Sequence, residues 1–201
     1  MLKLYTSLTS PYGRKCRMAA YVAGIADRVE VVTLDYHSDD YRKINPLGKV
    51  PALERDDGFI IIDSPLICSY LASLGDQAQL VPPPGDARLK AQVLEALADG
   101  ITDAGVLIFL ENKRSEDHRS HGWLKEQASK IDKGLDALED MADDFGDDIH
   151  IGILAVAASV SWLEFRTIVD GVRDGRPKLS AWLDAFAHKD FMVATAPPAD
   201  A

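Results

Sequence analysis

The apolar positions of this 201-residue chain follow two different periods, and the change comes after about residue 75. Before it, short β-branched runs are interrupted by short helical patterns. After it, apolar residues recur every three or four positions over long stretches, which is the spacing of an amphipathic helix. Three prolines and a glycine at 82–85 separate the two patterns and are the strongest linker signal in the chain. The sequence therefore predicts two domains, residues 1–77 and 86–201.

The first pattern predicts a compact α/β unit in the order strand, helix, strand, helix, strand, strand, helix. Ser10-Pro11 and Ser64-Pro65 each combine a capping residue with a proline, and Gly24 and Gly75 are expected to end the helices that follow. A right-handed crossover would make the first two strands parallel. Strands are expected at residues 3–6, 29–34, 52–54 and 59–62, the last two around the turn residues 56–58, with a short polar helix at 38–44.

The second pattern predicts an all-α domain. Two long amphipathic helices are expected at residues 87–113 and 118–143. Residues 151–169 are apolar nearly all round, which is typical of a central buried helix. Pro177 is expected to open the last helix. The fold class that follows is an α/β N-terminal domain joined to an all-helical C-terminal domain.

Composition and charge narrow the possible partners. Hydrophobic residues make up 47% and the net charge is −10, which disfavours nonspecific binding to nucleic acid or to an anionic membrane. The longest apolar run, 151–163, is too short to span a bilayer. Residues 1–5 lack a basic and then apolar leader, and two cysteines do not make a disulfide framework. We therefore expect a reduced, cytoplasmic protein with no nucleic-acid or membrane partner.

Three short motifs of the first domain point to a binding site for a peptide. Proline lacks an N–H, so Val50-Pro51 at the start of a strand leaves the Val50 backbone free to bond an extended peptide. Ser10 and Ser64 lie at helix N-termini, where unpaired N–H groups favour an anion. Asp63 could pair with an ammonium group. Each motif alone is more often a simple cap or turn, but three of them in one small unit favour a site.

A second candidate is a metal site built on histidine. His118 and His121 are three residues apart, beside Glu116 and Asp117, as a pair of ligands on one helical turn would be. No third ligand has a convincing spacing, and the segment is very polar. We expect a solvated helix start and no metal.

A third candidate is a reactive cysteine. Cys16 follows Arg14 and Lys15 and precedes Arg17, and such cations could lower the pKa of a thiol. It lies too far along its helix for an active-site end, so a packed or half-exposed thiol is expected, and Cys68 is expected in the core. The basic cluster itself is expected to be a solvated helix face, or alternatively a subunit contact.

These motifs resemble those of the cytosolic glutathione transferase superfamily, over essentially the whole chain, and most closely those of small bacterial members of the serine type. The matching segments are Thr9-Ser10-Pro11-Tyr12-x-Arg14-Lys15, Asn45-Pro46-Leu47-Gly48-Lys49-Val50-Pro51-Ala52-Leu53, Asp63-Ser64 and Glu95-Ala96-Leu97-Ala98-Asp99-Gly100. The resemblance implies a thioredoxin-like N-terminal domain, an all-helical C-terminal domain and a homodimer.

The resemblance also implies roles for single residues. Pro51 would be cis, and the Val50 backbone would pair with the cysteinyl residue of glutathione. Asp63 and Ser64 would bind the γ-glutamyl end, and Lys49 could approach the glycyl carboxylate. The Ser10 hydroxyl would donate a hydrogen bond to the sulfur.

Two residues compete for the hydrogen bond to the sulfur, because some classes of the superfamily use the residue one position before Ser10. Thr9 is therefore the nearest rival.

The implied activity is stabilisation of the glutathione thiolate for attack on a small hydrophobic electrophile, or related chemistry of the same thiol such as peroxide reduction, dehalogenation or isomerisation. The alternative is a binding or regulatory protein of the same fold without turnover. The pocket for the electrophile is expected between the domains, with walls at Tyr12, Ile101, Gly105, Ile108 and Phe109.

One segment departs from the pattern of this superfamily. Helices near residue 150 often begin there with Ser/Thr-x-x-Asp, but this chain has His150-Ile151-Gly152-Ile153. The start of that helix must therefore be satisfied in another way.

Overall fold

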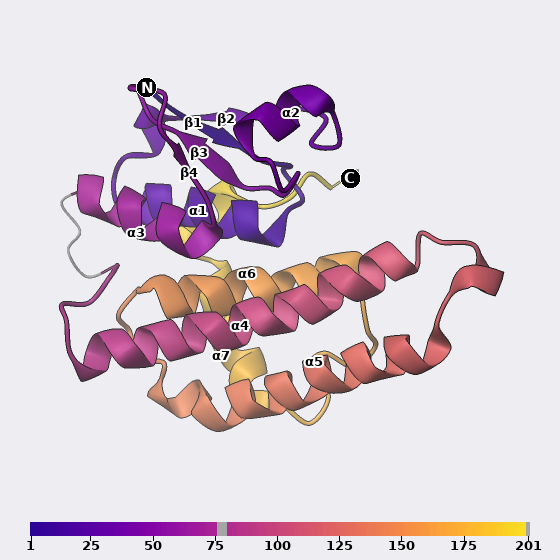
Figure 1. Ribbon diagram of the computed structural model, residues 1–201. Helices are drawn as coiled ribbons and strands as arrows, with labels where there is room; N and C mark the ends of the chain where they lie inside the picture. The colour runs from indigo at the N-terminus through magenta and orange to yellow at the C-terminus, as the bar shows by residue number, and fades with distance from the viewer. Residues whose placement is uncertain (76–79, 200–201) are drawn as a thin grey trace.

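The N-terminal domain of the computed structural model is a twisted sheet with helices packed on it (Figure 1). Among the residues that the structure describes, 1–75 and 80–199, four strands form one mixed sheet in the order β2-β1-β3-β4. β1 is parallel to β2, while the β1–β3 and β3–β4 pairs are antiparallel, as the predicted crossover and hairpin require. The elements are β1 (Leu2–Tyr5), α1 (Pro11–Val22), β2 (Val29–Val32), α2 (Asp39–Ile44), β3 (Ala52–Glu54), β4 (Ile60–Ile61) and α3 (Ser64–Leu74).

The C-terminal domain is helical, with α6 near its centre (Figure 1). Every residue from Ile151 to Val160 is buried, so the prediction of a central apolar helix is confirmed. Besides shifts of a few residues at the helix ends, two elements differ from the prediction: a 3₁₀ turn at Glu116–His118 precedes α5, and a short α8 follows the helix that was expected to be the last. The helices are α4 (Asp86–Glu111), α5 (His121–Met141), α6 (Ile151–Arg166), α7 (Pro177–Ala187) and α8 (Asp190–Ala194).

Helix α6 starts without a side-chain cap, and a close backbone approach fixes its first turn instead. The Ile151 N–H donates to the Leu80 carbonyl at 2.9 Å. A Cβ added at Gly152 would lie 2.5 Å from the Ala91 carbonyl oxygen of α4. The glycine therefore allows α6 to press against α4 where the two helices begin.

Helix α1 lies between the sheet and the helical domain, and this overturns the prediction of a solvated basic face. Arg14 is 8% exposed and Lys15 only 1%. Arg14 donates to the Ser161 hydroxyl of α6 at 2.8 Å and to the Met192 carbonyl of α8 at 3.1 Å. The reason is tertiary: α4, α6 and α8 cover the side of α1 that the sheet leaves open (Figure 1).

The end of the chain returns to the N-terminal domain, where Thr195 is buried beyond α8 (Figure 1). The domain boundary expected at residue 77 lies within 76–79, outside the described residues. Within residues 1–75 and 80–199, no helix is both long enough and apolar enough to cross a bilayer.

Candidate functional site

The Ser10 hydroxyl caps α1 and keeps its proton available. The Gly13 N–H donates to Ser10 Oγ at 3.2 Å, and Pro11 occupies the first helical position. A Cβ at Gly13 would lie 1.9 Å from the Thr6 hydroxyl oxygen, so glycine is required for the tight join between β1 and α1. A serine oxygen can accept one bond while its O–H donates another. Ser10, at 9% exposure, can therefore donate to a group held at the positive end of α1.

Thr9 is held differently from its neighbour. Its hydroxyl lies 2.9 Å from the Ser7 hydroxyl, so the two side chains are paired. Its carbonyl accepts a hydrogen bond from Trp162 Nε1 of α6 at 3.1 Å. Thr9 therefore ties the loop before α1 to the helical domain.

The Val50–Pro51 peptide bond is cis, and two buried side chains hold the loop that leads into it. Both the Tyr41 hydroxyl and the Asn45 amide donate to the Lys49 carbonyl, at 2.7 and 2.6 Å. Among the described residues, the Val50 backbone has no backbone hydrogen-bond partner. The loop therefore presents the Val50 amide and carbonyl just before the start of β3, with the Lys49 side chain exposed.

The start of α3 corrects one expectation and adds an unpaired hydroxyl. The cap is Asp63, whose carboxylate accepts from the Ser64 N–H, and Ser64 is the first helical residue. Either residue type can cap, and here the carboxylate occupies the capping position. Ser64 is 1% exposed, and its Oγ has no hydrogen-bond partner among residues 1–75 and 80–199. A buried hydroxyl of this kind needs a partner, which a bound ligand can supply.

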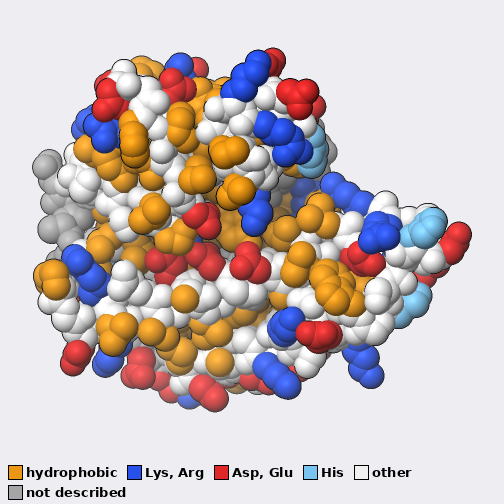
Figure 2. Space-filling view, in the orientation of Figure 1, with side chains coloured by type: hydrophobic (Ala, Val, Ile, Leu, Met, Phe, Trp, Pro, Cys, Tyr) orange, Lys and Arg blue, Asp and Glu red, His pale blue; other side chains and the backbone are white. Residues whose placement is uncertain are grey.

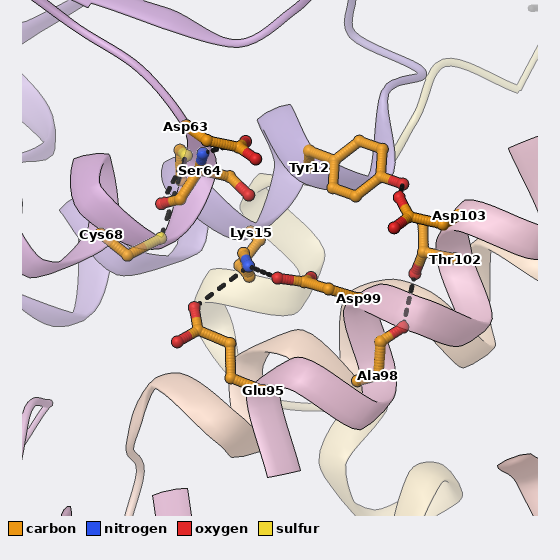
Figure 3. A network of polar contacts seen from close by, with 11 residues as sticks. Tyr12, Lys15, Asp63, Ser64, Cys68, Glu95, Ala98, Asp99, Thr102 and Asp103 are labelled. Carbon is orange, nitrogen blue, oxygen red and sulfur yellow. Dashed lines mark hydrogen bonds and ion pairs between the residues drawn. The ribbon is translucent and has the colours of Figure 1, made fainter. Parts of the chain in front are cut away.

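A row of carboxylates on α4 faces α1 across the seam between the domains (Figure 3). Lys15 Nζ lies 3.1 Å from Glu95 and 2.6 Å from Asp99, and the Tyr12 hydroxyl donates to Asp103. The sequence placed Glu95 and Asp99 in a matching segment but assigned no role to this row. Its signal was the recurrence of an acidic residue every four positions, which places all three on one helix face.

The carboxylates give this corner of the site a negative character. Burial raises the pKa of Asp99, Lys15 lowers it, and Glu95 and Asp63 raise it further, so that it lies above its usual value. Burial pushes the pKa of Lys15 down, but Cys68, Asp99 and Glu95 outweigh it, and Lys15 stays charged. Figure 2 shows acidic side chains gathered along the seam. A cationic group of a ligand fits this corner.

The phenol at this seam stays neutral. Burial, together with the Asp103 and Asp99 carboxylates, holds the pKa of Tyr12 well above its ordinary value. Tyr12 therefore acts as a hydrogen-bond donor to Asp103 at neutral pH.

The two cysteines are core residues, so a lowered thiol pKa is excluded for Cys16. Both side chains are 0% exposed, and their sulfurs lie 3.9 Å apart. Burial raises the pKa of Cys16, and the neighbouring Cys68 adds to the rise. The nucleophile of any thiol chemistry here must come from a ligand.

The histidine pair lies far out on the surface. Both His118 and His121 are exposed, and His118 Nδ1 contacts the Ser115 hydroxyl. In the part of the chain that the structure describes, no three His, Cys, Asp or Glu side chains gather as a metal site would require.

The residues expected to line the pocket for the electrophile fall into two groups. Ile101 and Ile108 are 3% and 4% exposed and belong to the helical core, so the structure does not bring them to the seam. Gly105 is buried against Trp162 and Leu163. Tyr12 and Phe109 are half-buried beside the loop before α1, Phe109 through its contact with Trp162.

The comparisons with known proteins agree with this geometry. Residues 4–79 match the family model described as glutathione S-transferase, N-terminal domain. The chain is 32% identical over 201 residues to the uncharacterized GST-like protein YibF of Escherichia coli K12, covering 98% of this chain and 99% of that protein. It also superposes on a glutathione transferase family member from Pseudomonas fluorescens Pf-5 with bound glutathione, with a TM-score of 0.94, 33% identity and coverage of 98% and 100%.

A second structure of the Pseudomonas fluorescens protein, with bound S-(propanoic acid)-glutathione, matches with a TM-score of 0.90 and 34% identity, covering 98% of this chain and 100% of that one. These likenesses extend over nearly the full length of each chain, through both the sheet domain and the helices. The chain therefore belongs to the glutathione S-transferase superfamily, with a thioredoxin-like N-terminal domain and a helical C-terminal domain.

Proposed function

We propose that this protein is a glutathione transferase: it binds glutathione across the starts of α1, β3 and α3 and stabilises the thiolate for attack on a small hydrophobic electrophile. The observation that carries the proposal is the buried Ser64 hydroxyl without a partner among the described residues, at a helix N-terminus beside Asp63. A ligand carboxylate would satisfy that hydroxyl and the neighbouring N–H groups.

Each part of glutathione has a chemical counterpart in the site. The γ-glutamyl carboxylate pairs with Ser64 and the first turn of α3, and its ammonium with Asp63. The cysteinyl backbone bonds Val50 as an added strand would, next to Pro51. The glycyl carboxylate lies within reach of Lys49, which is exposed.

Ser10 is the better donor to the sulfur of the two hydroxyls. Its oxygen accepts from Gly13 and its proton is left to donate, while the Thr9 hydroxyl is paired with Ser7. Both hydroxyls lie near the N-terminus of α1, whose dipole favours a negative sulfur. In the proposal Thr9 positions the loop and Ser10 contacts the thiolate.

The proposed reaction uses few protein groups. A free thiol has a pKa of about 8.5, and the thiolate is the nucleophile. A donated hydrogen bond and a helix N-terminus favour the ionised form, so the thiol proton passes to water and no protein base is needed. With an aryl halide, the sulfur forms a bond to the ring carbon, and the halide leaves with its bonding electron pair.

The relatives support the ligand. The Pseudomonas fluorescens protein binds glutathione in one structure and an S-substituted glutathione in another. As part of the proposal, we infer two properties for this chain: a site that binds the tripeptide, and space for a group attached to the sulfur of the tripeptide. A homodimer and a cytoplasmic location, expected from the sequence, also belong to the proposal.

A calorimetric titration with glutathione, paired with an assay of a neutral aryl halide, tests this proposal. Asp63→Ala should weaken glutathione binding about tenfold or more, since a hydrogen bond to a charged group contributes roughly 1.5–3 kcal/mol. Ser10→Ala should leave binding within a few fold and lower kcat by about ten- to a hundredfold on the same scale. Thr9→Val is the matched control and should change kcat little.

Two outcomes would contradict the proposal in different ways. Absence of binding at millimolar glutathione would remove glutathione as the ligand. Binding without turnover of any electrophile would favour the alternative, a binding or regulatory protein of the same fold.

A further inference from the structure

Two cations, from the ends of α4 and α6, lie over the ring of Phe109. Lys113 Nζ is 4.4 Å from the ring centroid, and Arg166 Cζ is 5.3 Å from it. The Trp162 indole meets the same ring edge to face, at 6.2 Å and 70°. We call Phe109, Lys113, Trp162 and Arg166 the Phe109 cluster.

The Phe109 cluster is linked directly to the proposed sulfur site. Trp162 Nε1 donates to the carbonyl of Thr9, the residue before Ser10. Along α4, Phe109 follows Asp103 by six residues, or about 9 Å at the rise of an α-helix. The indole of Trp162 thus contacts both the loop that carries Ser10 and the Phe109 ring.

The sign of the charge changes along α4. Glu95, Asp99 and Asp103 face α1 on the N-terminal side, and the Phe109 cluster follows on the C-terminal side. In a chain of net charge −10, this is a local basic spot. A ligand that reaches from the α4 carboxylates to the Phe109 cluster would place a cationic group at the carboxylates and an anionic group at the cluster.

Basic residues at helix C-termini also complement the helix dipole, which is a purely structural use of Lys113 and Arg166. The positions of the two charged groups include features that this structural use does not require. Lys113 is exposed, lies over an aromatic face, and has no ion-pair partner among residues 1–75 and 80–199. Its charge is thus positioned by the ring and left unneutralised, beside the guanidinium of Arg166, which also lies over Phe165 at 4.8 Å.

We infer that the Phe109 cluster selects electrophiles that carry a carboxylate or similar anion on the far side of an apolar ring. The apolar part packs beside the half-buried Phe109, and the anion pairs with Lys113 and Arg166. This inference rests on the proposed function, because it concerns the group attached to the glutathione sulfur.

The test compares two glutathione conjugates by calorimetry, so that it does not depend on turnover. They are the products of para-chloro-meta-nitrobenzoate and of the matching benzamide, which differ only in the charge of the para group. The acid conjugate should bind roughly tenfold more tightly than the amide conjugate. Lys113→Met should remove most of this preference and leave the affinity for the amide conjugate within about twofold.

Lys125→Met, which replaces an exposed lysine on α5, is the control and should keep the preference. Equal affinity of the wild type for the two conjugates, or a preference unchanged by Lys113→Met and by Arg166→Met, would overturn the inference while glutathione binding itself stands. If neither conjugate nor glutathione binds, the proposed function fails, and this inference fails with it.

Discussion

Lys15 shows how a single buried charge can join two domains. Its ammonium is 1% exposed and meets two carboxylates of α4. A buried ion pair is weak evidence for stability as a whole, because the charges lose their water. Removal of the lysine alone is strongly destabilising, because it leaves the two carboxylates buried and without a cation.

Replacement of this lysine should therefore be costly. Lys15→Met keeps most of the length of the side chain and leaves Glu95 and Asp99 without their cation, which should lower the free energy of unfolding by about 3–5 kcal/mol. Urea unfolding of the variant and the wild type measures this change in the free energy of unfolding. Lys43→Met, at an exposed pair with Asp40, is the control and should stay within about 0.5 kcal/mol.

A second variant separates lost charge pairing from lost packing. Adding Glu95→Gln and Asp99→Asn to Lys15→Met removes the orphaned charges and should recover part of the loss. If the combined variant is no more stable than Lys15→Met alone, unpaired charge is not the cause.

At the scale of an element, the start of α6 is held by backbone contacts. His150 provides no capping hydrogen bond, and Ile151 bonds the Leu80 carbonyl instead. Gly152 lies against the Ala91 carbonyl, an atom that cannot move without α4. Where the two helices begin, the close contact of α4 and α6 thus depends on the missing Cβ of Gly152.

This contact predicts opposite effects for the same substitution at two glycines. Gly152→Ala should destabilise the protein by about 1–3 kcal/mol, because overpacking forces the helices apart. Gly100→Ala on α4 has nothing within 4 Å of the added Cβ and should stabilise by up to about 1 kcal/mol. Thermal unfolding of the two variants beside the wild type compares them, and equal shifts in Tm would refute the close-contact account.

At the scale of the whole molecule, the sequence predicted what short-range patterns encode. The order of strands and helices, the hairpin around Gly58 and the central α6 follow from periodicity, turn residues and apolar runs. The cis bond at Val50–Pro51 was implied by the resemblance to the glutathione transferases, while the cap at Ser10 followed from the local Ser-Pro motif.

The contacts between the domains could not be predicted in the same way. Burial of Arg14 and Lys15 depends on α4, α6 and α8 covering α1, which no local pattern shows. Ser64 was expected to cap α3, but Asp63 does so, because both residue types suit that position. In the Phe109 cluster, Phe109 of α4 meets Trp162 and Arg166 of α6, which follow it by 53 and 57 positions in the chain, and only packing brings them together.

A thiolate held at the start of α1 is central to the proposed function. The most direct test is an ultraviolet titration of the glutathione thiol bound to the wild type and to Ser10→Ala. The wild type should hold the thiol pKa below the value of about 8.5 for a free thiol, and Ser10→Ala should raise it by about one unit, or roughly 1.4 kcal/mol. A bound thiol that titrates as free glutathione does, or at the same pH with and without the Ser10 hydroxyl, would contradict the account.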